Sequence, residues 1–126
     1  MEPSRSAIRI AVDAMGGDHA PREVVLGCLS VAREMPLVEV TLVGDESRIS
    51  AELRGVSVPS NVRVRHASQV IEMGESPVYA IRRKRDASIV HCAQMVQEGE
   101  ADAFFSAGNS GAAMAVAALQ IGRIPG

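Results

Sequence analysis

Residues 8–18 read IRIAVDAMGGD, in which a largely β-branched run passes directly into a loop with two adjacent glycines. Residues 8–13 have the length and composition of a buried strand, and Gly16 and Gly17 let the backbone turn freely after it. Apolar residues then recur at helical spacing, as at Val24 and Cys28, until Pro36 stops the pattern. The first unit of the fold is therefore expected to be a strand, a glycine loop and a helix.

The same alternation continues along the chain. Periodicity predicts strands over 38–43, 62–66 and 102–107, and helices over 46–53, 86–97 and 112–121. Between 69 and 85 the period is lost, which indicates a loop that leads into the next helix. Alternating strands and helices predict one α/β domain over 1–126, a Rossmann-like three-layer α/β/α arrangement around a mostly parallel sheet with right-handed crossovers.

Composition excludes several classes of protein. The chain has 126 residues, 47% of them hydrophobic, and a formal net charge of −2. This balance favours a soluble globular domain and gives no attraction to nucleic acid. Cys28 and Cys92 lie too far apart for a CxxC site and are expected to be small core residues. No signal peptide is recognisable, so a cytoplasmic location is expected.

Two glycine loops each join a predicted strand to a predicted helix, and in a parallel sheet both lie at the same edge. The loop at Gly108 and Gly111 opens a helix whose unpaired N–H groups suit phosphate. Ser106, Asn109 and Ser110 add side-chain donors. A tight connection between a strand and a helix has the same pattern, so the purely structural interpretation stays open.

The first loop contains acidic residues. Asp13 and Asp18 bring negative charge to the edge at which an anion is expected. Asp18 is interpreted as a cap of the following helix or as a group that fixes the loop through backbone N–H groups. His19 is a candidate base or phosphate donor, although a surface hydrogen-bonding role explains it equally. His66 and His91 have no ligand-type neighbours in the sequence, so neither a metal site nor any cofactor is expected.

Four consecutive cations, from Arg82 through Lys84 to Arg85, precede the helix over 86–97. The simplest interpretation is a solvated helix start. Clustered positive charge could instead neutralise phosphate or receive an acidic protein partner. The sequence leaves these alternatives open.

Residues 10–21, IAVDAMGGDHAP, resemble the opening signature of the PlsX family of phosphate acyltransferases, and residues 101–112, ADAFFSAGNSGA, resemble the second signature. The segments VIEM at 70–73, SP at 76–77 and AIRRK at 80–84 match in order between them. Ser110 stands where threonine is commoner, and Ala113 where a larger apolar residue is common. Members of the family continue well past residue 126, so the chain corresponds to the amino-terminal third to half.

The resemblance implies a fold related to the isocitrate/isopropylmalate dehydrogenase and phosphotransacetylase folds. It also implies transfer of a fatty acyl chain from acyl carrier protein to inorganic phosphate, giving acyl phosphate for phospholipid synthesis. A homodimer is implied, associated peripherally with the inner face of the membrane, with a glycerol-3-phosphate acyltransferase downstream. Phosphate itself is the nucleophile, and no catalytic side chain is identified. The expected binding residues are Gly16, Gly17, Asp18, His19, Arg82, Lys84, Ser106, Gly108, Asn109, Ser110 and Gly111.

Two other functions remain as alternatives. One is a non-catalytic fragment, or a phosphate- or nucleotide-binding α/β module that keeps the loops without turnover. The other is a dinucleotide-binding domain, which the sequence disfavours because the first loop reads GGD in place of GxGxxG.

Overall fold

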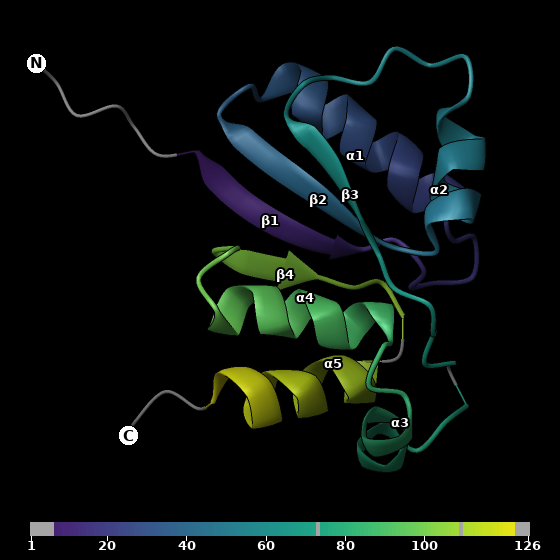
Figure 1. Ribbon diagram of the computed structural model, residues 1–126, viewed down its shortest axis with the longest axis vertical. Coiled ribbons are helices and arrows are strands. Elements are labelled where there is room, and N and C mark those ends of the chain that lie inside the picture. Colours follow the sequence, from purple (N-terminus) through teal and green to yellow (C-terminus); the bar gives the residue numbers. More distant parts are fainter. Residues whose placement is uncertain (1–6, 73, 109, 123–126) are drawn as a thin grey trace, which may run out of the picture.

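The computed structural model describes residues 7–72, 74–108 and 110–122. Within them a parallel sheet has the order β3-β2-β1-β4 (Figure 1). Its strands are β1 (Ile8–Asp13), β2 (Val38–Gly44), β3 (Val62–His66) and β4 (Ala103–Phe105). The chain moves outward from β1 to β3 and then returns to place β4 on the other side of β1. The carboxyl ends of β1 and β4 therefore flank the point where the strand order reverses, at which open α/β sheets bind ligands.

Helices cover both faces of this sheet and give the three-layer, Rossmann-like α/β arrangement that the alternation predicts. Helices α1 (Arg22–Glu34) and α2 (Glu46–Leu53) pack on one face, and α4 (Ser88–Gln97) packs on the other. Helix α5 (Ser110–Val116) and the π-helical turn η1 (Ala117–Ile121) lie beside α4 (Figure 1). Helix α3 (Pro77–Arg83) packs against α5.

Strand alternation decides which residues meet which helix layer. Val12 and Leu42 point toward α1 and α2, where they join a core that includes Leu29. Burying a side chain of this kind contributes about 1.5–3 kcal/mol. Ala11 points the opposite way and packs near Cys92 of α4. Asp13 lies two positions after Ala11, so its carboxyl group also points toward α4.

Most element boundaries agree with the prediction from periodicity. The first and third strands and the helix over 46–53 have the expected bounds, and the second strand gains only Gly44. Helix α4 begins at Ser88, two residues late, because residues 86 and 87 pair with Gln69 instead. The fourth strand ends at Phe105, because the chain turns at Ser106 toward Asp13.

The loop expected over 69–85 is wrong in part, because it contains α3. This helix has only seven residues, with Pro77 at its start and only Ala80 and Ile81 buried. Two buried positions are too few to produce a visible helical period. Proline at the first helical position suits a helix start, since its missing N–H would have no partner there.

The last helix also departs from expectation. It begins at Ser110 and closes with the π-helical turn η1. Val116 is buried, whereas Met114 is 75% exposed and Leu119 63% exposed. Within the described residues, the chain thus covers one side of this apolar helix. Cys92 is buried as predicted, but Cys28 is only half-buried.

In the part of the chain that the structure describes, every helix is too short or too polar to cross a lipid bilayer.

Candidate functional site

Asp13 is the last residue of β1 and is 4% exposed. Its Oδ1 atom accepts hydrogen bonds from Ser88 Oγ at 2.6 Å and from the backbone N–H of Met15 at 3.0 Å. Its Oδ2 atom accepts one from Ser106 Oγ at 2.9 Å. Burial raises the pKa of the Asp13 carboxyl above its ordinary value, and the donors from Ser88 and Ser106 oppose part of this shift.

These bonds join three elements at the switch point of the sheet. Ser88 is the first residue of α4 and is 1% exposed, while Ser106 directly follows β4 and is partly exposed. The Asp13 cluster, defined as Asp13, Ser88 and Ser106, therefore holds the ends of two neighbouring strands and the start of one helix together. The negative charge of Asp13 is directed at donors of its own chain.

The Ser106 hydroxyl has two acceptors within reach. Its single proton can be donated to Asp13 or to the carbonyl oxygen of Gly108, which lies 3.1 Å away. The Gly108 N–H points back at the same hydroxyl oxygen over 3.4 Å. Ser106 thus connects the buried carboxylate to the backbone of the second glycine loop.

The two glycine loops touch each other, and this contact requires glycine at two positions. A Cβ atom at Gly108 would lie 2.3 Å from the backbone nitrogen of Gly17. A Cβ atom at Gly16 would lie 2.8 Å from Ser106 Oγ and 3.0 Å from the Gly108 nitrogen. The space beside both α-carbons is therefore filled by the opposite loop, because β1 and β4 are neighbours in the sheet.

A cavity of about 260 Å³ opens beside the first loop. Gly16, Gly17, Asp18 and His19 line it together with Ala107 from the second loop and residues at the start of α1. Asp18 and His19 are both exposed. Asp18 does not cap α1, which is one of the two roles expected for it, because the helix begins at Arg22 after Pro21 and has no side-chain cap.

The predicted cations lie on a different element. Arg82 belongs to α3 and borders a second cavity, of about 330 Å³, together with Arg85 and residues of α4. Lys84 follows α3, donates to the carbonyl oxygen of Val70 at 2.8 Å and forms an ion pair with Glu75. Lys84 is therefore held by its own chain.

Two of the remaining predicted residues lie at the start of α5. Gly111 is exposed in the first turn, and Ser110 is the first helical residue. Asn109 lies outside the described residues. Gly16, Gly17, Ser106 and Gly108 are thus brought into direct contact, with Asp18 and His19 beside them.

Asp13 and Ser88 are the residues that the expected binding set lacks. Asp13 appeared in the sequence only as an unfavourable charge, and Ser88 appeared as an ordinary residue of a helix. The available signal was a lone carboxylate that follows the apolar run 10–12 at the end of the strand, since a buried carboxylate requires polar partners.

Across the described residues, no group of three or more His, Cys, Asp or Glu side chains is arranged to hold a metal ion. The chemistry that the site offers consists of hydroxyl and amide donors around one buried carboxylate.

A family model described as fatty acid synthesis protein matches residues 8–126. The phosphate acyltransferase of Desulfitobacterium hafniense (strain DSM 10664 / DCB-2) is 52% identical over 119 residues, covering 94% of this chain and 35% of the relative. That of Pelotomaculum thermopropionicum is 50% identical over 119 residues, covering 94% and 34%. That of Gloeothece citriformis is 51% identical over 121 residues, covering 96% and 34%. The chain spans about a third of the length of these curated relatives.

Proposed function

Because this chain belongs to the fatty acid synthesis protein family, we propose that the whole protein transfers a fatty acyl group from acyl carrier protein to inorganic phosphate. The observation that carries this proposal is the match of residues 8–126 to the family, with relatives named phosphate acyltransferase at about 50% identity. The product is acyl phosphate, which supplies phospholipid synthesis.

The reaction asks little covalent chemistry of the protein. An oxygen of phosphate attacks the thioester carbonyl carbon, the carbon–sulfur bond breaks, and the proton of the phosphate passes to the departing thiolate. The protein has to hold a dianion beside the acyl group and stabilise the oxyanion that forms. Hydroxyl and amide donors perform this role, and losing one such donor typically costs about 3–4 kcal/mol in the transition state.

We place the phosphate site beside the contact between the two glycine loops. Support comes from the position of this contact at the reversal of strand order, where α/β sheets bind ligands. The cavity lined by Gly16 to His19 opens there. The Ser106 hydroxyl and the Gly108 N–H, which bond within the chain in this structure, are the donors that would turn to phosphate. Asn109, Ser110 and Gly111 follow Gly108 in the sequence and complete the proposed site.

The basic residues that precede α4 are the proposed docking site for acyl carrier protein. Arg82, Arg83 and Arg85 are exposed, and across the described residues none of the three forms an ion pair. Lys84 differs, because it is paired with Glu75. High salt should therefore raise the apparent KM for the carrier protein, and Arg85→Glu should raise it more than Lys84→Gln. A homodimer in the cytoplasm, attached peripherally to the membrane, belongs to the same proposal.

The test is an assay of acyl phosphate formation from acyl carrier protein thioester and phosphate by the whole protein. Asn109→Ala should lower turnover by about a hundredfold or more without changing the urea midpoint of unfolding. Asn61→Ala is the matched control, since Asn61 donates to the carbonyl oxygens of Ala32 at 2.9 Å and Val38 at 2.8 Å. That variant should lower the midpoint and leave turnover per folded molecule unchanged. Equal losses of stability and turnover in Asn109→Ala would contradict the proposed site.

The same assay separates catalysis from binding alone. Phosphate that binds the protein without any acyl phosphate being formed would support a phosphate-binding module and overturn the proposed transfer. Titration with NAD tests the dinucleotide alternative, for which we expect no binding.

A further inference from the structure

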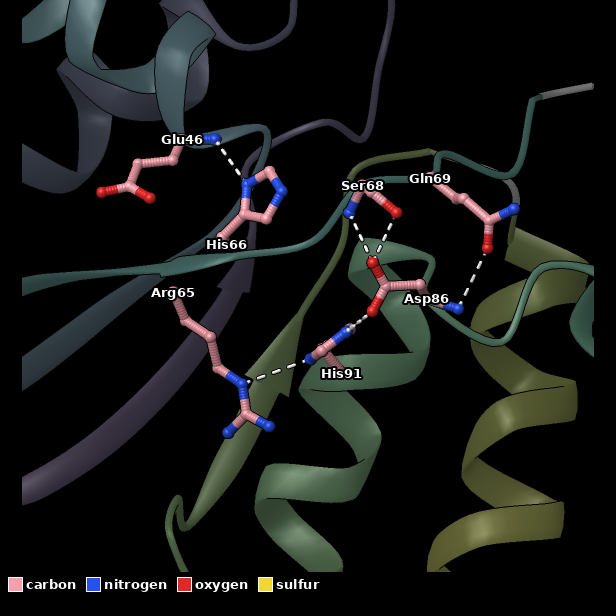
Figure 2. Close-up of polar contacts among 7 residues, drawn as sticks. All are labelled: Glu46, Arg65, His66, Ser68, Gln69, Asp86 and His91. Carbon is pink, nitrogen blue, oxygen red and sulfur yellow. Dashed lines mark hydrogen bonds and ion pairs between the residues drawn. The ribbon is translucent and has the colours of Figure 1, made fainter.

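A second polar network lies at the carboxyl end of β3, on the side of the sheet that α4 covers. Its centre is His91, in the second turn of α4, whose side chain is 15% exposed. Figure 2 shows the imidazole between two charged groups. Arg65 Nε donates to His91 Nδ1 at 3.2 Å, and His91 Nε2 lies 2.6 Å from Asp86 Oδ1.

These two contacts determine where the proton of the imidazole sits. The Nε atom of an arginine always carries hydrogen, so His91 Nδ1 has to be the acceptor and carries no proton. The ring proton is therefore on Nε2 and is donated to the Asp86 carboxylate. An imidazolium would present an N–H to the N–H of Arg65, and that contact would be lost.

The charged groups around His91 are held on both sides. Arg65 comes from β3 and is paired through its Nη1 atom with Glu100 Oε2 at 3.0 Å. Asp86 belongs to the connection before α4, and its Oδ2 accepts from both the backbone N–H and the hydroxyl of Ser68. The hydroxyl of Ser68, and then the imidazole of His91, hold the pKa of the Asp86 carboxyl well below its usual range.

Asp86 also ties together two backbone segments. Its N–H donates to the side-chain oxygen of Gln69 at 3.1 Å, and its carbonyl oxygen accepts from the Gln69 N–H at 3.2 Å. The Gln69 carbonyl oxygen in turn accepts from the Ser88 N–H at 3.0 Å. Residues 86–88 thus lie along the segment that follows β3. The last of them, Ser88, donates its hydroxyl hydrogen bond to Asp13 at 2.6 Å.

We propose that His91, held as the neutral Nε2–H tautomer between Arg65 and Asp86, is a positioning residue that aims Ser88 at Asp13. It acts through Asp86, which fastens the start of α4 to the end of β3. The consequence for phosphate binding rests on the proposed function, whereas the tautomer and the placement of Ser88 do not.

The direct test is nitrogen NMR of the histidine rings in the full chain at pH 8. We expect His91 to show a protonated Nε2 and an unprotonated, hydrogen-bonded Nδ1. Arg65→Met should remove the hydrogen-bond shift of Nδ1. A protonated Nδ1 in the wild-type protein would overturn the proposal.

Amide hydrogen exchange tests the positioning role. His91→Leu removes both contacts and should speed exchange of the Ser88 N–H by about tenfold or more relative to the wild type. His91→Gln keeps one acceptor and one donor and should restore most of the protection. His66→Leu is the matched control, because His66 Nδ1 accepts from the Glu46 N–H at 3.1 Å. It should expose the Glu46 amide and leave Ser88 protected.

If His91→Leu folds and its Ser88 N–H exchanges at the wild-type rate, the positioning role is overturned. If His91→Leu does not fold, loss of Ser88 protection in His91→Gln would overturn it.

Titration with inorganic phosphate then separates the two proposals. Weakened binding in His91→Leu with rescue in His91→Gln is the expected result. Binding that stays unchanged while Ser88 exchange responds would keep the positioning role and contradict the proposed phosphate site. A wild-type protein that binds no phosphate would contradict the proposed function alone.

Discussion

The Oδ1 atom of Asp13 accepts a hydrogen bond from Ser88 Oγ at 2.6 Å across 75 positions of the chain. This contact joins the end of β1 to the start of α4, and the other oxygen of the same carboxylate binds Ser106 after β4. One side chain thereby connects three elements at the point where the strand order reverses. Stability and phosphate binding should both depend on it.

Asp13→Ala should lower the free energy of unfolding by about 2–5 kcal/mol, because it leaves buried donors without acceptors. Water cannot replace the lost acceptor, because Ser88 is only 1% exposed. Urea unfolding measures the change. Asp18→Ala is the matched control and should stay within about 0.5 kcal/mol, since Asp18 is exposed and caps no helix.

The double variant Asp13→Ala with Ser88→Ala should be less destabilised than the sum of the two single variants. Additive losses would mean that the two side chains do not interact in solution, contrary to the 2.6 Å contact.

Asp13 should titrate above the ordinary aspartate value of 3.8, because burial opposes its ionisation. As pH rises from 3.8 through the folded pKa, the unfolded chain loses its proton first, so this group lowers stability over that window. Asp45 should behave oppositely: the Ser47 hydroxyl lowers its pKa, so the stability it adds above 3.8 is lost as pH falls. Carbon NMR of the carboxyl groups measures both titration midpoints. An Asp13 midpoint at or below that of Asp45 would contradict these predictions.

Local signals in the sequence are sufficient for most of the fold. A β-branched run such as residues 8–13 and a helical period such as that of α1 need no knowledge of distant residues. The short helix α3 was missed because it buries only Ala80 and Ile81. Its stability comes from packing against α5 and from the fixed start at Pro77, which are tertiary effects.

The candidate site was predicted less completely, because its contacts are long-range. The glycine loops could be placed at one edge by topology alone, and they meet there. Asp13 and Ser106 are 93 positions apart, and only the placement of β4 beside β1 brings them together. The sequence gives no sign of the contacts of His91, since Asp86 precedes α4 and Arg65 lies on β3.

The contact between the glycine loops allows one further prediction from a pair of matched substitutions. Gly27 lies in the exposed middle of α1, and a Cβ atom there would meet nothing within 4 Å. Gly27→Ala should therefore stabilise the protein by about 0.5–1 kcal/mol, because alanine has the higher helix propensity.

Gly108→Ala adds the same methyl group 2.3 Å from the Gly17 nitrogen, where only backbone can move. Forcing the two loops apart should destabilise the protein by about 1–3 kcal/mol, and it would pull Ser106 away from Asp13. Urea unfolding of both variants, with a phosphate titration of Gly108→Ala, measures these effects. A Gly108→Ala protein as stable as Gly27→Ala would show that the loops are not in contact in solution. The proposed phosphate site would then lose its main support.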